Sequence, residues 1–136
     1  MKVLFVCRGN VARSQMAEAI YNKLTNSQDA NSAGTHVEAQ GETLGARKKR
    51  VGRSDAVDVM NDHGLIPNDK QQTQLTKDML SEYDLVVSMA AKRYTPKWLS
   101  SSPKYVYWKI TDPKGRGYEI TNRTRQQIER KIREIT

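Results

Sequence analysis

A short apolar run that leads into a glycine-containing loop constrains the fold more than any other feature of the sequence. Residues 3–6, Val-Leu-Phe-Val, predict a buried strand. A helix is expected to start near Arg13 and to point its free amides back at the loop. The loop residues after Cys7 are the candidate oxyanion-binding residues: Arg8, Gly9, Asn10, Val11, Ala12, Arg13 and Ser14. This order of strand, anion-binding turn and helix predicts an α/β fold with the loop after the first strand, at the carboxyl edge of a sheet.

The loop has the residue types that phosphate chemistry requires. Gly9 and Asn10 tolerate the left-handed backbone that a loop needs to curl around an anion. Arg13 is suited to bidentate contact with two oxygens of a phosphoryl group. Cys7, the only cysteine, is expected to ionise and to act as a nucleophile, with Ser14 donating to the thiolate. Most lone cysteines are small buried residues, but the Cys-x5-Arg-Ser spacing around Gly-Asn favours the nucleophile.

A phosphocysteine mechanism also needs an acid for the leaving group and a base for water. Asp112 is the best candidate, because it follows a predicted strand at residues 105–110 and precedes Pro113, which holds the backbone extended. Asp-Pro alone is a common turn signal. Its value here comes from the pairing with the Cys-x5-Arg loop, so the catalytic set is Cys7, Arg13 and Asp112.

Alternating patterns along the chain predict one domain over residues 1–136: an open sheet of about four parallel strands flanked by helices. Strands are expected at residues 3–6, 31–33, 85–89 and 105–110. Helices are expected from Arg13, from a Ser54 cap to Gly64, from a Thr76 cap to Leu80, and from near Thr121 to the end. The residues expected to face the core from the first and last helices are Met16, Ile20, Leu24, Ile128, Ile132 and Ile135.

Several segments in this order resemble the low-molecular-weight protein tyrosine phosphatase family over nearly the whole length. They are the amino-terminal loop, Ser32-Ala33-Gly34-Thr35, Met60-Asn61-Asp62-His63-Gly64, residues 84–89 and Asp112-Pro113. The resemblance implies that Cys7 is the nucleophile, Arg13 binds phosphate, Ser14 stabilises the thiolate and Asp112 is the general acid and then base. It also implies hydrogen bonds from Asn10 to Ser32 and His63 behind the loop. His63 at a helix end could instead favour the negative end of the helix dipole.

The chain departs from the family pattern at two positions. Ala12 stands where many members carry a second loop cysteine, so a protective disulfide with Cys7 is excluded. Lys114-Gly115-Arg116-Gly117 follow Asp112-Pro113, where phosphotyrosine enzymes of the family usually have aromatic residues. The missing aromatic residues weaken the case for phosphotyrosine but not the case for phosphatase chemistry. The resemblance implies hydrolysis of phosphate monoesters, with phosphotyrosine in proteins as the expected substrate class and a phosphorylated protein or small phosphate ester as the partner.

Two alternatives share the same loop. The chain also resembles the thioredoxin-coupled arsenate reductases around residues 107–113, but their relay needs two further cysteines, and this sequence has none. Arsenate reduction would then require an external thiol. A non-catalytic oxyanion-binding protein is the other alternative, and the presence of both Cys7 and Asp112 argues against it.

The remaining sequence features limit the possible partners, metal sites and location of the protein. The formal net charge of +8 raises the possibility of a nucleic-acid binder, but the cations are dispersed and no nucleic-acid motif organises them. The basic run Arg47-Lys48-Lys49-Arg50, extended to Arg53, is either a solvated face or a site for an acidic partner. One cysteine and two distant histidines predict no metal site, and no cofactor is expected. No apolar segment of membrane-spanning length occurs, and a cytoplasmic location is expected.

Overall fold

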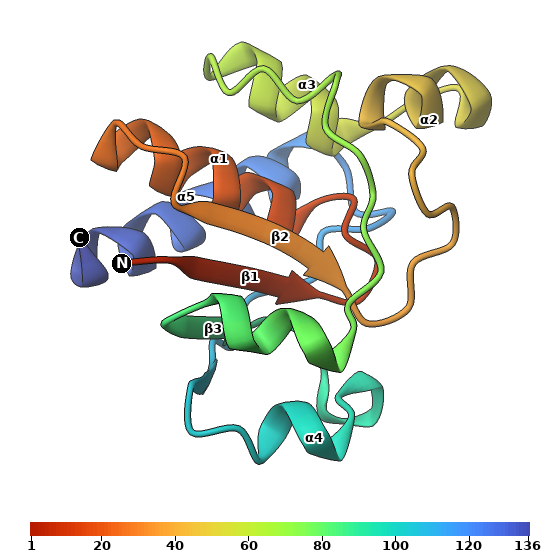
Figure 1. Cartoon of the computed structure of the whole chain (residues 1–136). Coiled ribbons are helices and arrows are strands. Elements are labelled where there is room, and N and C mark those ends of the chain that lie inside the picture. The colour runs from red at the N-terminus through yellow and green to blue at the C-terminus, as the bar shows by residue number, and fades with distance from the viewer.

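The computed structural model describes residues 1–136, the whole chain, and places four parallel strands in one sheet between two layers of helices (Figure 1). The strands lie in the order β2-β1-β3-β4. The elements in chain order are β1 (Val3–Cys7), α1 (Arg13–Thr25), β2 (Ala30–Gly34), α2 (Leu44–Val51), α3 (Asp55–Asp62), the 3-10 helix η1 (Lys77–Glu82), β3 (Leu85–Ser88), the 3-10 helix η2 (Lys92–Tyr94), α4 (Lys97–Ser100), β4 (Tyr105–Tyr107) and α5 (Tyr118–Ile135).

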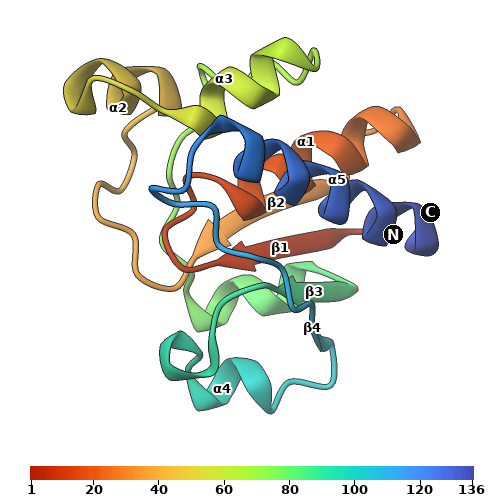
Figure 2. The same cartoon turned by 180° about the vertical axis from the view of Figure 1, so that it is seen from behind.

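The central strand β1 is buried on both faces, which explains why its sequence is a continuous apolar run. Val3 and Phe5 face the larger core cluster, which includes residues of α1, α3 and α5. Leu4 and Val6 face a second cluster, to which η1 contributes Leu80 and α4 contributes Leu99. The helices therefore cover opposite faces of the sheet, α1 and α5 on one side and η1 and α4 on the other (Figures 1 and 2).

The carboxyl ends of the strands meet at the edge of the sheet opposite both chain termini (Figures 1 and 2). Cys7 is level with Gly34 of β2, and Val6 is level with Ser88 of β3. Gly34 needs to be glycine, because a Cβ there would lie 2.7 Å from the backbone oxygen of Arg8 and 2.9 Å from the backbone nitrogen of Asn10. The end of β2 thus packs directly against the loop that follows β1.

The predicted fold class and all four predicted strands are confirmed, with changes at their ends. The fourth strand pairs only over Tyr105–Tyr107, although Trp108 still donates its backbone N–H to Ser88 at 2.9 Å. The helix capped by Ser54 is confirmed, since the Ser54 hydroxyl accepts the N–H of Val57. The segment after Thr76 is a 3-10 helix without a side-chain cap, and α5 begins at Tyr118, one turn earlier than expected.

Two predictions about the helices were wrong or incomplete. Leu24 was expected to face the core, but it is 38% exposed in the last turn of α1, at the rim of a groove between α1 and α5. Helix α2 was not predicted at all, because only Leu44 among its eight residues is buried and its periodic apolar signal is absent. Its start is set by Thr43, whose hydroxyl accepts the N–H of Ala46.

The last helix, α5, is amphipathic: Ile128 and Ile132 are fully buried, and charged residues occupy the outer face. Ile135 also packs against the larger core cluster, as expected. None of the helices is both long and apolar enough to cross a membrane.

Candidate active site

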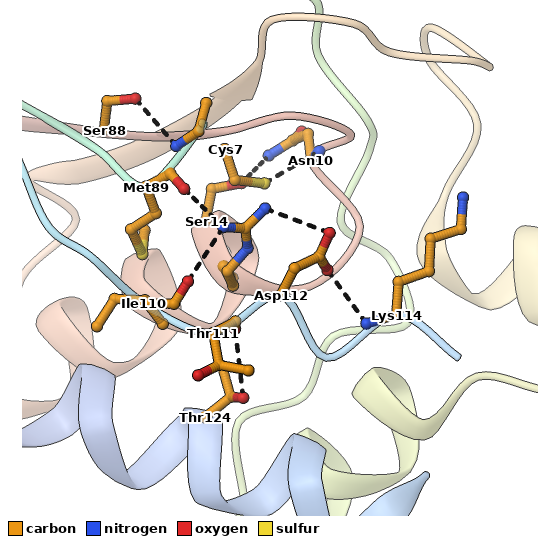
Figure 3. Close-up of polar contacts among 12 residues, drawn as sticks. Cys7, Asn10, Ser14, Ser88, Met89, Ile110, Thr111, Asp112, Lys114 and Thr124 are labelled. Carbon is orange, nitrogen blue, oxygen red and sulfur yellow. Dashed lines mark hydrogen bonds and ion pairs between the residues drawn. The ribbon is translucent and has the colours of Figure 1, made fainter. Parts of the chain in front are cut away.

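The only cysteine lies at the carboxyl end of β1, where polar hydrogens converge on its sulfur (Figure 3). Cys7 Sγ is 3.0 Å from Ser14 Oγ and accepts the backbone N–H of Asn10 at 3.3 Å. Ser14 Oγ itself accepts a hydrogen bond from Asn10 Nδ2, so its hydroxyl proton remains for the sulfur. These contacts favour a negatively charged sulfur, which is the nucleophilic form of cysteine.

Helix α1 starts directly behind the sulfur, and its amino-terminal amides are not capped. Ala12 occupies the N-cap position and offers no side-chain acceptor, and the first turn contains no acidic residue. The free N–H groups and the positive end of the helix dipole are therefore available to an anion held in the loop.

Asn10 fixes the shape of the loop from behind. Its backbone is left-handed, with φ 56°, and its side chain is completely buried. Its Nδ2 donates to Ser14 Oγ at 2.8 Å and to Ser32 Oγ at 3.0 Å. Its Oδ1 accepts the backbone N–H of Thr73 at 2.8 Å and Gln15 Nε2 at 3.2 Å. The asparagine amide thus connects the loop to α1, β2 and the segment before η1.

Arg13 is buried at the edge of the sheet and is held by backbone carbonyls that follow two other strands. Its Nη1 donates to the carbonyl oxygen of Met89 at 2.6 Å and to that of Ile110 at 3.4 Å. Its Nη2 lies 3.7 Å from Oδ2 of Asp112. The guanidinium therefore has a fixed orientation before any ligand arrives.

Asp112 lies on the loop between β4 and α5, in front of the Cys7 loop (Figure 3). Its side chain is 53% exposed, so it is open to solvent and to a bound substrate. Its Oδ1 accepts the backbone N–H of Lys114 at 3.1 Å, which restricts the rotation of the carboxylate. The Thr124 hydroxyl of α5 lies 3.0 Å from the carbonyl oxygen of Ile120 in its own helix and 3.5 Å from that of Thr111, so this loop lies against the helix.

A pocket of about 60 Å³ opens between the two loops. The expected catalytic residues Cys7, Arg13 and Asp112 all line it, as do four other loop residues, Arg8, Gly9, Val11 and Ala12. Asn10 and Ser14 lie behind the loop and are completely buried. Four further cationic or neutral side chains line the pocket, Arg47, Lys114, His36 and Gln72, together with one acidic side chain, Glu38. No cluster of three or more His, Cys, Asp or Glu residues could hold a metal ion.

The expected contact between Asn10 and His63 is wrong. His63 is the C-cap residue of α3, and its Nδ1 lies 2.8 Å from the carbonyl oxygen of Val59. Gln15 Nε2 and the backbone N–H of Thr73 donate to Asn10 instead, and neither contact was predicted from the sequence. Ser32 was placed correctly, since its Oγ accepts from Asn10.

Of the five basic side chains at residues 47–53, three are paired with acidic neighbours, Lys49 is exposed and forms no ion pair, and Arg47 borders the pocket. Lys48, Arg50 and Arg53 form ion pairs with Asp58, Glu42 and Asp55. Arg50 donates two hydrogen bonds to Glu42, and they lower the pKa of that carboxyl below its usual value. Arg47 forms no ion pair and lines the pocket instead. Most of the run is therefore structural, and one member borders the candidate site.

Comparisons with known proteins agree with this geometry. The sequence model of the family "Low molecular weight phosphotyrosine protein phosphatase" matches residues 2–136. An arsenate reductase of Brevibacillus brevis is 29% identical over 98% of this chain and 92% of its own length. A protein-arginine-phosphatase of Bacillus subtilis is 26% identical over 99% of this chain and 94% of its own length.

A solved structure shows the same likeness in three dimensions. The low molecular weight protein tyrosine phosphatase from T. tengcongensis superimposes with a TM-score of 0.79 at 28% sequence identity, over 99% of this chain and 97% of that chain. The loop after β1, the four-stranded parallel sheet and the match over residues 2–136 lead to one conclusion: this chain belongs to the low molecular weight phosphotyrosine protein phosphatase family.

Proposed function

We propose that the protein hydrolyses phosphate monoesters by covalent catalysis at Cys7, with phosphotyrosine in proteins as its substrate class. The observation that carries the proposal is the sulfur of Cys7, which has two polar hydrogens directed at it beside the uncapped start of α1. Arg13 and Asp112 stand around the same pocket. A nucleophile, an oxyanion-binding cation and a proton donor are the groups that this reaction needs.

In the first step, Cys7 Sγ attacks phosphorus and forms a P–S bond while the P–O bond to the leaving group breaks. Asp112 donates a proton to the departing oxygen, so the alcohol or phenol leaves neutral. Arg13 and the amides of residues 8–13 hold the three equatorial oxygens, where negative charge is concentrated. The products of this step are the alcohol and a cysteinyl phosphate.

In the second step, the Asp112 carboxylate takes a proton from water, and the water oxygen attacks phosphorus. The P–S bond breaks, inorganic phosphate leaves, and the electron pair returns to sulfur as a thiolate. Ser14 stabilises that thiolate as a leaving group through its hydroxyl hydrogen bond. Asp112 thus ends the cycle protonated and ready for the next substrate.

Arsenate reduction is a second candidate, because arsenate reductases are among the relatives. Reduction of arsenate to arsenite needs two electrons, which two thiols supply when they form one disulfide. Cys7 is the only cysteine of this chain, so the second thiol must come from a separate molecule, such as glutathione.

The experiment compares four substrates with the purified protein: p-nitrophenyl phosphate, a phosphotyrosine peptide, a phosphoarginine peptide, and arsenate with glutathione. We expect hydrolysis of the first two, loss of turnover in Cys7→Ser, and a phosphate adduct on Cys7 detectable by mass spectrometry after rapid acid quenching. Asp112→Asn should slow turnover by about 10²–10⁴-fold. Normal turnover by Cys7→Ser would refute the mechanism, and arsenate-dependent oxidation of glutathione without phosphatase activity would favour the reductase.

A further inference from the structure

A second concavity adjoins the catalytic pocket on the side of β4. It measures about 530 Å³, far more than the pocket itself, and it lies between η2 and the loop that carries Asp112. Arg8, Arg13 and Asp112 line both concavities, so the two share a wall. Whatever extends from a phosphoryl group in the pocket in this direction enters the groove.

Three cations without carboxylate partners line this groove: Arg8, Arg93 and Lys109. All three side chains are exposed, and none of them forms an ion pair with a carboxylate. The only acidic residue of the groove is Asp112, which lies 3.7 Å from Arg13. Elsewhere on the same end of the molecule, Lys48, Arg50 and Arg53 are neutralised by acidic neighbours.

One aromatic side chain, Tyr94, holds two of these cations, Arg8 and Arg93, in place. The guanidinium carbon of Arg8 lies 4.2 Å from the centre of the Tyr94 ring, and that of Arg93 lies 4.9 Å from the same ring. His36 packs against Tyr94 at 5.3 Å between ring centres and supports its position. A guanidinium stacked on a ring keeps its N–H groups free at its edges, where a carboxylate binds in the plane. Tyr107, which is 48% exposed, adds an apolar wall.

We propose that this groove binds acidic residues of the substrate polypeptide next to its phosphorylated residue, and that the enzyme therefore selects phosphoproteins with acidic flanking sequence. The inference rests on the proposed phosphatase function and names the class of substrate for it. The groove shares a wall with the pocket and an extended peptide advances by only about 3.3 Å per residue, so residues close in sequence to the phosphorylated one enter the groove. The groove, rather than the basic run of α2, is then the site that recognises an acidic partner.

The test compares two phosphotyrosine peptides that differ only in having aspartate or serine at the flanking positions. For the wild-type protein we expect kcat/KM to be about 10-fold higher with the acidic peptide. The double variant Arg93→Gln/Lys109→Gln should lose about 5- to 10-fold in kcat/KM for the acidic peptide, through KM, since two exposed ion pairs contribute that much. Its activity on p-nitrophenyl phosphate should remain normal, because neither residue lines the catalytic pocket.

A matched control separates the groove from the overall positive charge. Lys77→Gln/Arg130→Gln removes the same number of charges at two exposed positions that do not line the groove. We expect this variant to change kcat/KM for the acidic peptide by less than 2-fold. Equal losses in the two double variants, or equal kcat/KM for both peptides in the wild type, would overturn the proposal.

Binding measurements make the result independent of turnover. Cys7→Ser protein should bind the acidic phosphopeptide about 10-fold more tightly than the serine peptide, and Arg93→Gln/Lys109→Gln should abolish the difference. If p-nitrophenyl phosphate is not hydrolysed but this preference is observed, the phosphatase proposal fails and the groove remains. If a short oligonucleotide displaces the acidic peptide at equal concentration and the double variant removes that competition, the groove binds nucleic acid and the peptide proposal is wrong.

Discussion

Asn10 offers the most direct test of how the loop is held, because its backbone and its side chain contribute separately. Its φ of 56° lies in the left-handed region, which glycine adopts freely and alanine does not. Its side-chain amide makes four hydrogen bonds, three of them buried, to Ser14, Ser32 and Gln15, and one part-buried, to Thr73. Asn10→Gly removes the buried side chain and its hydrogen bonds without straining the backbone, whereas Asn10→Ala removes the hydrogen bonds and adds backbone strain.

The magnitudes follow from the contacts. In Asn10→Gly the backbone N–H of Thr73 loses its partner at 2.8 Å, and a buried unpaired donor costs about 1–3 kcal/mol. The hydroxyl oxygens of Ser14 and Ser32 each lose a neutral hydrogen bond, which adds about 0.5–1.5 kcal/mol per bond. The expected loss is about 2–6 kcal/mol in the free energy of unfolding. Asn10→Ala should lose about 1–2 kcal/mol more, since a left-handed backbone costs that much without glycine.

The assay is urea denaturation of the wild type and both variants, followed by kcat measurements on p-nitrophenyl phosphate at a temperature where all three are folded. Both variants should also lose activity, because the N–H of Asn10 and the hydroxyl of Ser14 then no longer aim reliably at Cys7. An Asn10→Gly variant as stable as the wild type would refute the hydrogen-bond argument. An Asn10→Ala variant more stable than Asn10→Gly would refute the backbone argument.

Three further predictions concern separate parts of the molecule. Gly34→Ala should lower the free energy of unfolding by about 1–3 kcal/mol in urea denaturation, because the new Cβ would lie 2.7 Å from the backbone oxygen of Arg8. Gly9→Ala is the control. Its Cβ would meet nothing closer than 3.8 Å, so the free energy of unfolding should change little. Asp112→Asn should lower kcat/KM, which reports the step that releases the leaving group, more for a substrate with a poor leaving group than for p-nitrophenyl phosphate. An equal loss of kcat/KM for both substrates would contradict its proposed role as general acid. The hydrogen bonds from Arg50 lower the pKa of the Glu42 carboxyl in the folded protein. The stabilisation that they give is therefore present above the ordinary pKa of 4.5 and is lost as the pH falls through the lower pKa of the folded state. Glu42→Gln should flatten this part of the dependence of the melting temperature on pH.

The parts of the site that are local in sequence were predictable, because a short segment contains all their determinants. Cys7, Asn10 and Ser14 fall within eight residues, and strand, loop and helix fix their relative positions. Ser32 and Asp112 were also placed correctly at the carboxyl edge of the sheet, since that edge collects the ends of parallel strands. The order of these segments along the chain, together with the family resemblance, was sufficient to place both residues near the loop.

The contacts that fix Arg13 had no such signal. Its acceptors are the backbone carbonyls of Met89 and Ile110, and a carbonyl oxygen is the same for every residue type. The same holds for the backbone N–H of Thr73, which takes the place expected for His63 beside Asn10. Helix α2 escaped prediction for a related reason, because ion pairs and a Thr43 cap define it rather than an apolar stripe.

The place of Arg13 in the loop was predictable from the sequence, but the contacts that orient its side chain were not. It belongs to the loop after β1, but its orientation is set by carbonyls after β3 and β4 and by Asp112. The cation proposed to bind the phosphoryl oxygens is thus fixed in part by the segment that also carries the proposed general acid. Because both groups are held before substrate binds, little reorganisation is needed in the transition state, and preorganised charge of this kind lowers the barrier most in a partly buried site. Any substitution that shifts the loop at residues 110–114 is therefore expected to affect phosphate binding as well as proton transfer.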